Sequence, residues 1–305
     1  MQKLLDAFFT QANDIILGKT PALKLAMCCL LARGHLLIED VPGVGKTTLA
    51  NTLAHLLGLN YQRVQFTSDL LPADILGTTV FDPVKQVFTF HPGAVFTQVL
   101  LADEINRTTP KTQSALLEAM EEKQVTIERK TYDLPTPFFV IATQNPLSQI
   151  GTYPLPESQL DRFLMCISLG FPDRYAERSL LKGEDRRLLL QSKSICMNPQ
   201  QLIELQNSVA AVHVSEALLD YLQALIHYTR QSDDYAYGLS PRAGLALLAA
   251  ARAWAFLNNR SMVLPEDVQA ILGAVAGHRL RRAHGIGGSA SDSVVAPLLE
   301  KVAVP

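Results

Sequence analysis

Two glycines, a lysine and a threonine stand close together in the segment Gly43-Val-Gly-Lys-Thr-Thr48. Glycines let backbone N–H groups turn toward an anion, and a lysine after them can reach the β- and γ-phosphates of a nucleotide. The next hydroxyl can ligate Mg²⁺, and a helix beginning here adds partial positive charge. The spacing predicts a phosphate-binding loop, with a tight strand-to-helix turn as the alternative. The residues expected to bind nucleotide are Pro42, Gly43, Val44, Gly45, Lys46, Thr47 and Thr48.

One position departs from the general loop pattern G-x-x-x-x-G-K-[ST], because Asp40 stands where the first glycine belongs. That position mainly serves the exit from the preceding strand. The departure therefore weakens the formal match more than it weakens the chemistry. Other polar residues have to decide whether the loop serves an enzyme.

Adjacent carboxylates end an apolar run in Val99-Leu-Leu-Ala-Asp-Glu104. Asp103 is placed to hold Mg²⁺, directly or through water, opposite Thr47. Glu104 is placed to polarise an attacking water as a general base. A second apolar run, from Phe138, ends at Asn145, which we expect to orient that water or contact the γ-phosphate. The alternatives are two solvated carboxylates at a strand end and an ordinary Asn-Pro turn.

Two arginines outside the predicted loop are candidates for contacts with nucleotide. Arg162 follows Asp161 just before a predicted strand, and we expect it to complete a neighbouring subunit's site as an arginine finger. An ion pair with Asp161 or Glu157 is the alternative. Arg242 falls in the first turn of a helix opened by Ser240, where a cation opposes the helix dipole. The compensating anion is then a γ-phosphate or the carboxylate of a surface salt bridge.

Other cations are harder to assign from the sequence. Arg107 could contact nucleotide across an interface or pair with a local carboxylate, and both interpretations stay open. His91 and the group Arg279, Arg281 and Arg282 are expected on solvated faces.

The elements that must position these residues follow an alternating pattern. Apolar and β-branched runs alternate with helical segments at 48–57 and 111–121, which favours an α/β fold with a doubly wound parallel sheet. In such sheets ligands bind beyond the carboxyl ends of the strands, where the polar residues stand. The runs are Leu36–Ile38, Arg63–Phe66, Val99–Ala102, Phe138–Thr143 and Phe163–Ser168.

Two segments break the alternation, and the chain then changes character. Short alternating stretches near 74–92 and 123–136 predict two hairpins inserted in the α/β part. After Asp173 only helix signals remain, at 202–212, 217–228, 241–257 and 265–280. We therefore predict an α/β nucleotide-binding domain over 1–172 and a smaller all-α domain over 173–305.

Length and composition limit the class of protein. The 305 residues carry a formal net charge of −2, which gives no overall electrostatic footprint for nucleic acid. Residues 1–10 lack the layout of a signal peptide, and the longest apolar stretch, 25–32, is too short to span a bilayer. Cys28, Cys29, Cys166 and Cys196 fit no metal motif. We expect reduced core cysteines in a cytoplasmic protein.

With these residues assembled, the chain resembles the AAA+ ATPases, and within them the MoxR family. The resemblance covers residues 4–282. Its landmarks are a phosphate loop at 39–47, a Walker B segment at 102–107, a sensor 1 segment at 142–146, an arginine-finger segment at 155–163 and a sensor 2 segment at 238–242. The Glu39-Asp-Val-Pro-Gly start looks like the MoxR version of the loop. Ile15-Ile-Leu-Gly-Lys19 sits where the family contacts adenine, which marks Ile16 and Gly18.

The resemblance implies a fold and an activity. The fold is a five-stranded parallel sheet in a three-layer αβα arrangement with a helical lid, assembled as a hexameric ring. The activity is Mg²⁺-dependent ATP hydrolysis, with Lys46 on phosphate, Thr47 and Asp103 on the metal, Glu104 activating water and Asn145 positioning it. Arg162 would complete the neighbouring site, and Arg242 would couple the lid to nucleotide state.

The role implied by the resemblance is chaperone-like remodelling or maturation of a protein client, often with a von Willebrand factor A-domain partner. Two rivals stay open. A DNA-associated motor would need a cationic loop, for which Glu128-Arg-Lys130 supplies two positive charges against one negative. An ATP-binding switch with negligible turnover would have no need of Glu104 as a base.

Overall fold

A computed structural model describes residues 1–305 except 85, 146–150, 184, 284–290 and 305. Its centre is a five-stranded parallel sheet with strand order β2-β5-β8-β1-β9. This confirms the predicted α/β class and the predicted parallel sheet. The strands are β1 Leu36–Glu39, β2 Tyr61–Gln65, β5 Val99–Asp103, β8 Phe139–Gln144 and β9 Met165–Ile167.

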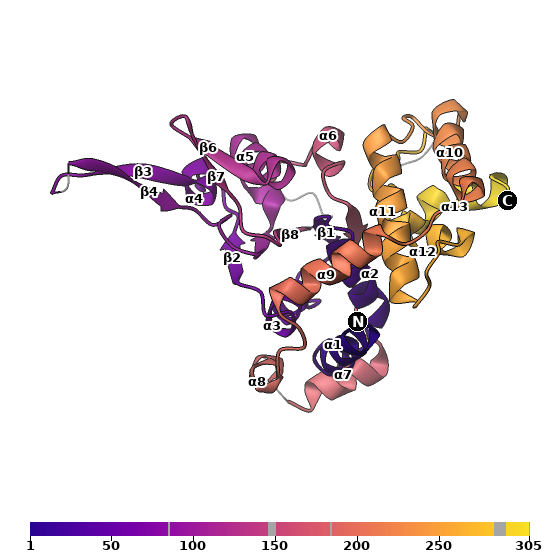
Figure 1. Cartoon of the computed structure of the whole chain (residues 1–305), viewed down its shortest axis with the longest axis horizontal. Helices are drawn as coiled ribbons and strands as arrows, with labels where there is room; N and C mark the ends of the chain where they lie inside the picture. The colour runs from indigo at the N-terminus through magenta and orange to yellow at the C-terminus, as the bar shows by residue number, and fades with distance from the viewer. Residues whose placement is uncertain (85, 146–150, 184, 284–290, 305) are drawn as a thin grey trace.

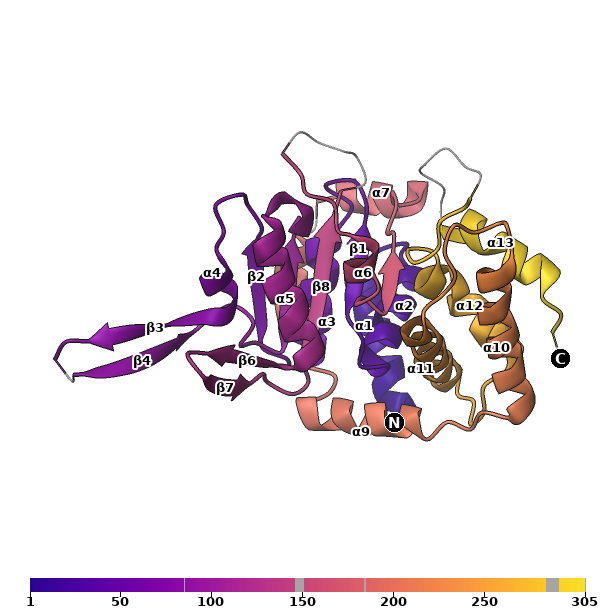
Figure 2. The same cartoon turned by 90° about the horizontal axis from the view of Figure 1, so that it is seen from above.

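Successive residues of the central strands alternate between two buried faces. On β1, Leu36 and Ile38 join one hydrophobic cluster, whereas Leu37 joins the other. Helices cover both faces, which is why these strands are apolar throughout rather than alternating with polar residues. The first cluster holds residues of α1 Gln2–Ile15, α2 Thr20–Leu31 and α3 Lys46–Leu56, and the second holds residues of α4 Pro72–Leu76 and α5 Pro110–Glu122. Figure 2 shows α5 on the opposite side of the sheet from α1 and α3.

Both predicted hairpins are present. Strands β3 Gly77–Asp82 and β4 Val87–Pro92 form an antiparallel ribbon that projects from the body of the molecule (Figure 1). Strands β6 Gln124–Ile127 and β7 Lys130–Asp133 form the second hairpin, beside the base of the first. The rings of Phe90 and Tyr132 stack with centroids 4.0 Å apart, so one aromatic pair joins the two hairpins.

The helices after β9 pack in two places. Three of them, α7 Arg174–Leu181, α8 Arg186–Ser192 and α9 Pro199–Ala210, stay beside the α/β part, where α8 contacts α1 and α3 and α9 contacts α2. The others form a bundle next to the β9 edge of the sheet (Figure 2). The bundle comprises α10 Glu216–Gln231, α11 Pro241–Leu257, α12 Pro265–Ala276 and α13 Ser291–Lys301. The domain boundary near residue 173 stays a prediction.

The bundle shares its core with the α/β part. Helix α11 contacts α2 and α9, and α12 contacts β9. Small side chains such as Ala243, Ala250 and Ala251 on α11 are fully buried, which lets this helix lie close to its neighbours. The first hydrophobic cluster therefore runs from the sheet into the bundle without a break.

One surface assignment from the sequence is wrong. Arg279 was expected on a solvated face, but its side chain is only 4% exposed. It pairs with Asp161 at 2.7 Å and also donates to the backbone carbonyls of Asp161, Phe163 and Leu164. Burial lowers the pKa of Arg279, and the Asp161 carboxylate opposes that shift. The contact exists because residues 118 positions apart in sequence meet where the bundle joins the sheet.

The other surface predictions and the cysteine prediction agree with the structure, with one qualification. His91, Arg281 and Arg282 are exposed. All four cysteines are free; three are buried, and Cys196 is half-buried near Gln11 rather than inside the core.

Candidate active site

A cleft of about 420 Å³ opens at the carboxyl ends of the central strands. The cleft is lined by the loop between β1 and α3, the end of β5 and the residue after β8. Parallel-sheet topology brings these strand ends together. Residues of β2 close the side of the cleft. The lining residues are Pro42, Gly43, Gly45, Lys46, Thr47, Thr48, Arg63, Gln65, Asp103, Glu104 and Asn145.

The loop has the backbone shape that an anion site needs. Gly43 and Gly45 have φ angles of 85° and 103°, a region that side chains disfavour. A Cβ atom added at either position would meet nothing within 4 Å, so the requirement for glycine comes from the backbone conformation and not from crowding. Helix α3 begins at Lys46 without a side-chain cap on its first N–H groups. Its N-terminal donors therefore remain for an anion in the cleft.

Lys46 lies at the floor of the cleft, half-buried. Its ammonium donates to the backbone carbonyl oxygen of Asp40 and, at 3.3 Å, to that of Gln144. Burial lowers the pKa of Lys46, and the nearby carboxylates of Asp40, Asp103 and Glu104 oppose that shift. Two carbonyls from neighbouring strands thus hold this cation where the loop glycines face it.

Asp40 has a structural role that the loop pattern does not predict. Its carboxylate accepts hydrogen bonds from Ser168 Oγ (2.9 Å) and from the backbone N–H groups of Leu169 (2.7 Å), Gly170 (2.6 Å) and Val41 (2.8 Å). Burial alone would raise the pKa of Asp40, but these hydrogen bonds hold it below its usual value. Asp40 therefore fastens the exit of β1 to the segment that follows β9.

Asp103 ends β5 with both carboxylate oxygens engaged. Thr143 on β8 donates its hydroxyl to Oδ1 at 2.7 Å. Arg63 on β2 donates to Oδ2 through Nη2 at 2.7 Å and Nε at 3.2 Å. The side chain of Asp103 is 14% exposed, and that of Arg63 is 46% exposed. The carboxylate is thus held from both neighbouring strands.

Glu104 is positioned by its backbone as well as by its partners. Its φ and ψ of 58° and 51° are left-handed, which is uncommon for a residue other than glycine. Its backbone N–H donates to the Thr143 hydroxyl at 2.9 Å. Its carboxylate accepts from Gln65 Nε2 at 2.9 Å and pairs with Arg107 Nε at 3.0 Å. This geometry puts Arg107 in a local ion pair, one of the two interpretations left open above.

Sequence reasoning missed three residues of this network: Arg63, Gln65 and Thr143. Arg63 and Gln65 offered a partial signal, because polar residues two apart in the predicted strand 63–66 share one face. Their register beside Asp103 is known only from the structure. Thr143 lies at the end of an apolar run and looks like part of it. Nothing in the sequence shows that its hydroxyl links Asp103 to Glu104.

Not every predicted site residue lines the cleft. Asn145 does, together with Lys46 and Glu104. Arg162 and Arg242 do not; both pair with Glu121 on α5, Arg162 at 3.0 Å. Arg162 also donates to the carbonyl of Leu117 at 2.7 Å, so its partners are neither Asp161 nor Glu157.

The predicted adenine contacts also lie apart from the cleft lining. Ile16 is buried in the first hydrophobic cluster at the end of α1. Gly18 has a φ of 68°, and a Cβ there would lie 3.2 Å from the Asp173 carboxylate at the start of α7. Val44 is partly buried against the first cluster. The role of Ile16 and Gly18 in binding adenine stays a prediction.

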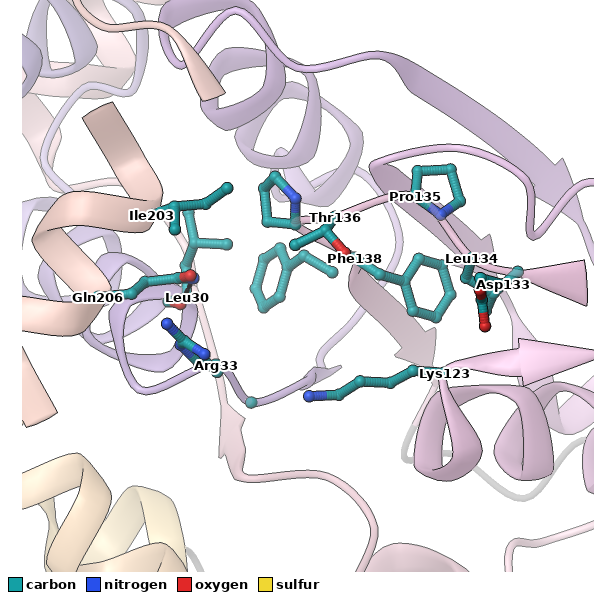
Figure 3. A pocket seen from close by; sticks show the side chains of 13 residues that line it. Leu30, Arg33, Lys123, Asp133, Leu134, Pro135, Thr136, Phe138, Ile203 and Gln206 are labelled. Atoms are coloured by element: carbon teal, nitrogen blue, oxygen red, sulfur yellow. Dashed lines mark hydrogen bonds between the residues drawn. The ribbon is translucent and has the colours of Figure 1, made fainter. Parts of the chain in front are cut away.

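A second cavity of about 430 Å³ lies at the opposite ends of the strands, between β8, α9 and the ends of α2 and α5. Figure 3 shows Arg33 and Lys123 at this cavity, with Phe138 and Ile203 among the apolar side chains. Arg33 donates to Asn207 at 2.6 Å. This cavity is remote from the glycine loop and from Asp103, so we place no catalytic chemistry there.

A parallel sheet with a glycine-lysine loop after β1, adjacent carboxylates at the end of β5 and a helical bundle defines an AAA+ ATPase. Comparison with known families agrees: residues 35–165 match the ATPase family associated with various cellular activities (AAA), and residues 227–298 match the AAA lid domain. Among the described residues, no helix is long and apolar enough to cross a membrane.

Similar proteins are known from several bacteria. Chaperone MoxR1 of Mycobacterium tuberculosis is 40% identical over 88% of this chain and 74% of its own length. Protein MoxR of Paracoccus denitrificans is 33% identical over 88% and 86%, and YeaC of Bacillus subtilis is 39% identical over 100% and 96%. The crystal structure of a protein from Cytophaga hutchinsonii described as an ATPase superposes with a TM-score of 0.89 at 36% identity, covering 100% of this chain and 96% of that one. The chain belongs to the MoxR family of AAA+ ATPases.

Proposed function

We propose that this ATPase hydrolyses ATP with Mg²⁺ and couples the reaction to remodelling of a protein client. The observation that carries the proposal is that Lys46, Thr47, Asp103 and Glu104 line one cleft. Lys46 and the loop N–H groups would bind the phosphates. Glu104 would act as general base toward water, and Asn145 would orient that water.

The donor set fits magnesium. Mg²⁺ prefers oxygen ligands and is commonly held by one or two protein groups together with phosphate and water. The Thr47 hydroxyl and the Asp103 carboxylate, both lining the cleft, would hold it. The metal would neutralise phosphate charge during transfer.

The catalytic role of Glu104 is tested by Glu104→Gln, which removes the base but preserves the shape and the hydrogen bond from Gln65. We expect ATP binding near that of the wild type and turnover reduced by at least about 100-fold. Binding is measured with a fluorescent ATP analogue and turnover by phosphate release. Turnover close to that of the wild type would exclude Glu104 as the base.

We propose further that the protein works as an oligomer, a hexameric ring in the family arrangement, and that Arg162 completes a neighbouring subunit's site. The support is that Arg162 lies outside the cleft of its own chain and is 29% exposed. Arg242 on α11 shares its partner Glu121, so we infer that Arg242 couples the bundle to the position of Arg162.

Turnover per subunit, measured across a range of protein concentrations, tests this arrangement. We expect specific activity to rise with concentration in the wild type, because a shared site exists only in the assembly. Arg162→Ala should still bind ATP, but its specific activity should stay low at every protein concentration. Activity that is independent of concentration and of Arg162 would show that each subunit is self-contained.

The β3–β4 ribbon is the surface that we propose for the client. It exposes Val80, Phe81, Val84, Val87 and Phe88, which is unusual apolar content for a ribbon with no cover of its own. The Phe81 and Phe88 rings lie side by side, with centroids 5.1 Å apart. The relative named a chaperone supports a client protein, and a von Willebrand factor A-domain partner is part of the same proposal.

The free cysteines fit a reducing compartment, and we propose the cytoplasm.

The double variant Val84→Ser with Phe88→Ser tests the ribbon. Both side chains are exposed and distant from the cleft, so basal ATP turnover should be unchanged. Protection of a heat-denatured model protein from aggregation should fall. Thr89→Ser, on the same ribbon, is the control. Unchanged protection in the double variant would show that the ribbon does not bind the client.

A further inference from the structure

Arg63 occupies an oxygen that a metal would need. Both of its contacts to Asp103, from Nη2 at 2.7 Å and from Nε at 3.2 Å, fall on Oδ2. The other oxygen, Oδ1, already accepts the Thr143 hydroxyl. A metal that binds Asp103 directly through Oδ2 therefore competes with the guanidinium for that oxygen.

The charges in the cleft explain why a cation stands there. Asp103 and Glu104 are adjacent in sequence and both line the cleft, so their carboxylates concentrate negative charge there. Lys46 donates to two backbone carbonyls, whereas Arg63 and Arg107 pair with the two carboxylates. Arg63 is thus the counter-ion of Asp103.

The position of Arg63 suits a cation that can leave. It lies on β2, at an edge of the sheet, with 46% of its side chain exposed, and it lines the cleft. A partly exposed ion pair is worth little net free energy, because solvent screens both charges. A doubly charged ion on the same oxygen would compete well against it.

We propose that Arg63 is a resident counter-cation that holds Asp103 in the metal-free protein and is displaced from Oδ2 when Mg²⁺ binds with nucleotide. This inference rests on the magnesium site proposed above and adds a positioning residue that sets how much Mg²⁺ the site requires. Arg63 neutralises and orients Asp103 while no metal is bound, and Mg²⁺ has to compete with it for Oδ2.

The test is Mg²⁺-dependent binding of fluorescent ADP, which needs no turnover. Wild type, Arg63→Gln and Arg63→Lys are titrated with Mg²⁺ at fixed ADP, starting from protein stripped with a chelator. In Arg63→Gln the half-saturating Mg²⁺ concentration should fall by about 2- to 5-fold, as expected for a partly exposed ion pair. Arg63→Lys retains the charge but loses the two-donor contact of the guanidinium, so its half-saturating Mg²⁺ concentration should fall less than that of Arg63→Gln. Arg33→Gln, a cation at the far end of the strands, is the control.

The outcomes separate the inference from the proposal beneath it. A lower Mg²⁺ requirement in Arg63→Gln than in both the wild type and Arg63→Lys supports displacement. An unchanged or higher requirement in Arg63→Gln overturns it, while the magnesium site stands. An equal fall in Arg63→Lys also overturns it, because a structural disturbance would then explain both variants. Wild-type ADP binding that is indifferent to Mg²⁺ would refute the magnesium site itself, and the inference with it.

Discussion

Arg162 and Arg242 pair with a single carboxylate, that of Glu121 on α5. Arg162 follows the short helix α6, Glu157–Leu160, and Arg242 opens α11 in the bundle. One anion therefore joins the predicted arginine finger to the lid, and both guanidinium groups lie away from the cleft of their own chain. Glu121 also supplies the anion that a cation in the first turn of α11 requires.

Removing that anion should affect assembly-dependent activity more than stability. In Glu121→Gln both arginines lose their shared counter-ion, and we expect turnover at high protein concentration to fall several-fold. The unfolding free energy should change by less than about 1 kcal/mol for each pair, because the groups are partly exposed. Glu118→Gln, an exposed glutamate on the same helix, is the control. Full turnover in Glu121→Gln would show that the shared pairing has no role in the reaction.

Thr143→Val should destabilise the protein and loosen the positions of Asp103 and Glu104 in the cleft. The threonine is fully buried, and its hydroxyl both donates to Asp103 and accepts from the Glu104 N–H. Valine has nearly the same shape but leaves that N–H without its acceptor, at a cost of about 1–3 kcal/mol. Urea unfolding should show the loss, and turnover should fall because Glu104 is less firmly held. Thr126→Val on the exposed β6–β7 hairpin should do neither.

Asp40→Asn should be destabilising in a pH-dependent way. An amide presents an NH₂ group to backbone donors that now meet carboxylate oxygens, which costs about 1–3 kcal/mol at neutral pH. Because the folded pKa of Asp40 lies below its ordinary 3.8, its contribution is complete above that pH and is lost as pH falls through the folded pKa. The difference between the variant and the wild type should therefore shrink below pH 4. A constant difference down to pH 3 would contradict this account, and Asp220→Asn on α10 is the control.

His35 should make the wild type less stable in mild acid. Its Nδ1 accepts the Val140 N–H at 3.0 Å and its Nε2 lies 3.2 Å from the Met120 carbonyl, so the buried ring is held neutral. Burial lowers its pKa from 6.5 to about 4. Stability is therefore complete above pH 6.5 and falls, by at most about 1.4 kcal/mol per pH unit for this group, as pH drops toward 4.

Unfolding measured between pH 7 and 4 tests that slope. His35→Gln should show a shallower dependence, although His278, whose pKa burial lowers to about 3, contributes a similar slope. The exposed His91→Gln is the control variant. An identical slope in His35→Gln would mean that His35 does not titrate between the folded and unfolded states as inferred.

The elements of the α/β part could be predicted because their signals are local. The strand runs are apolar because both faces of the sheet are covered, and the loop at Gly43 and Gly45 needs residues that tolerate positive φ. Helix α11 begins at Pro241 and ends at Leu257, as the proline and the periodicity predict. The helices α1 and α2 were not among the predicted elements; both bury apolar side chains in the first hydrophobic cluster.

Residue types and spacing are enough to predict the chemistry of the site: a phosphate loop, a carboxylate pair after β5 and a polar residue after β8, each at the end of an apolar strand. Local residue types and parallel topology suffice to bring such strand ends together. Which charges pair depends on the three-dimensional packing of the chain. Arg63 meets Asp103 across 40 residues, Arg242 meets Glu121 across 121, and Arg279 meets Asp161 across 118. Ion pairs carry no sequence period, because any cation can satisfy any carboxylate that the fold brings within reach, so the packing of the chain chooses the partner.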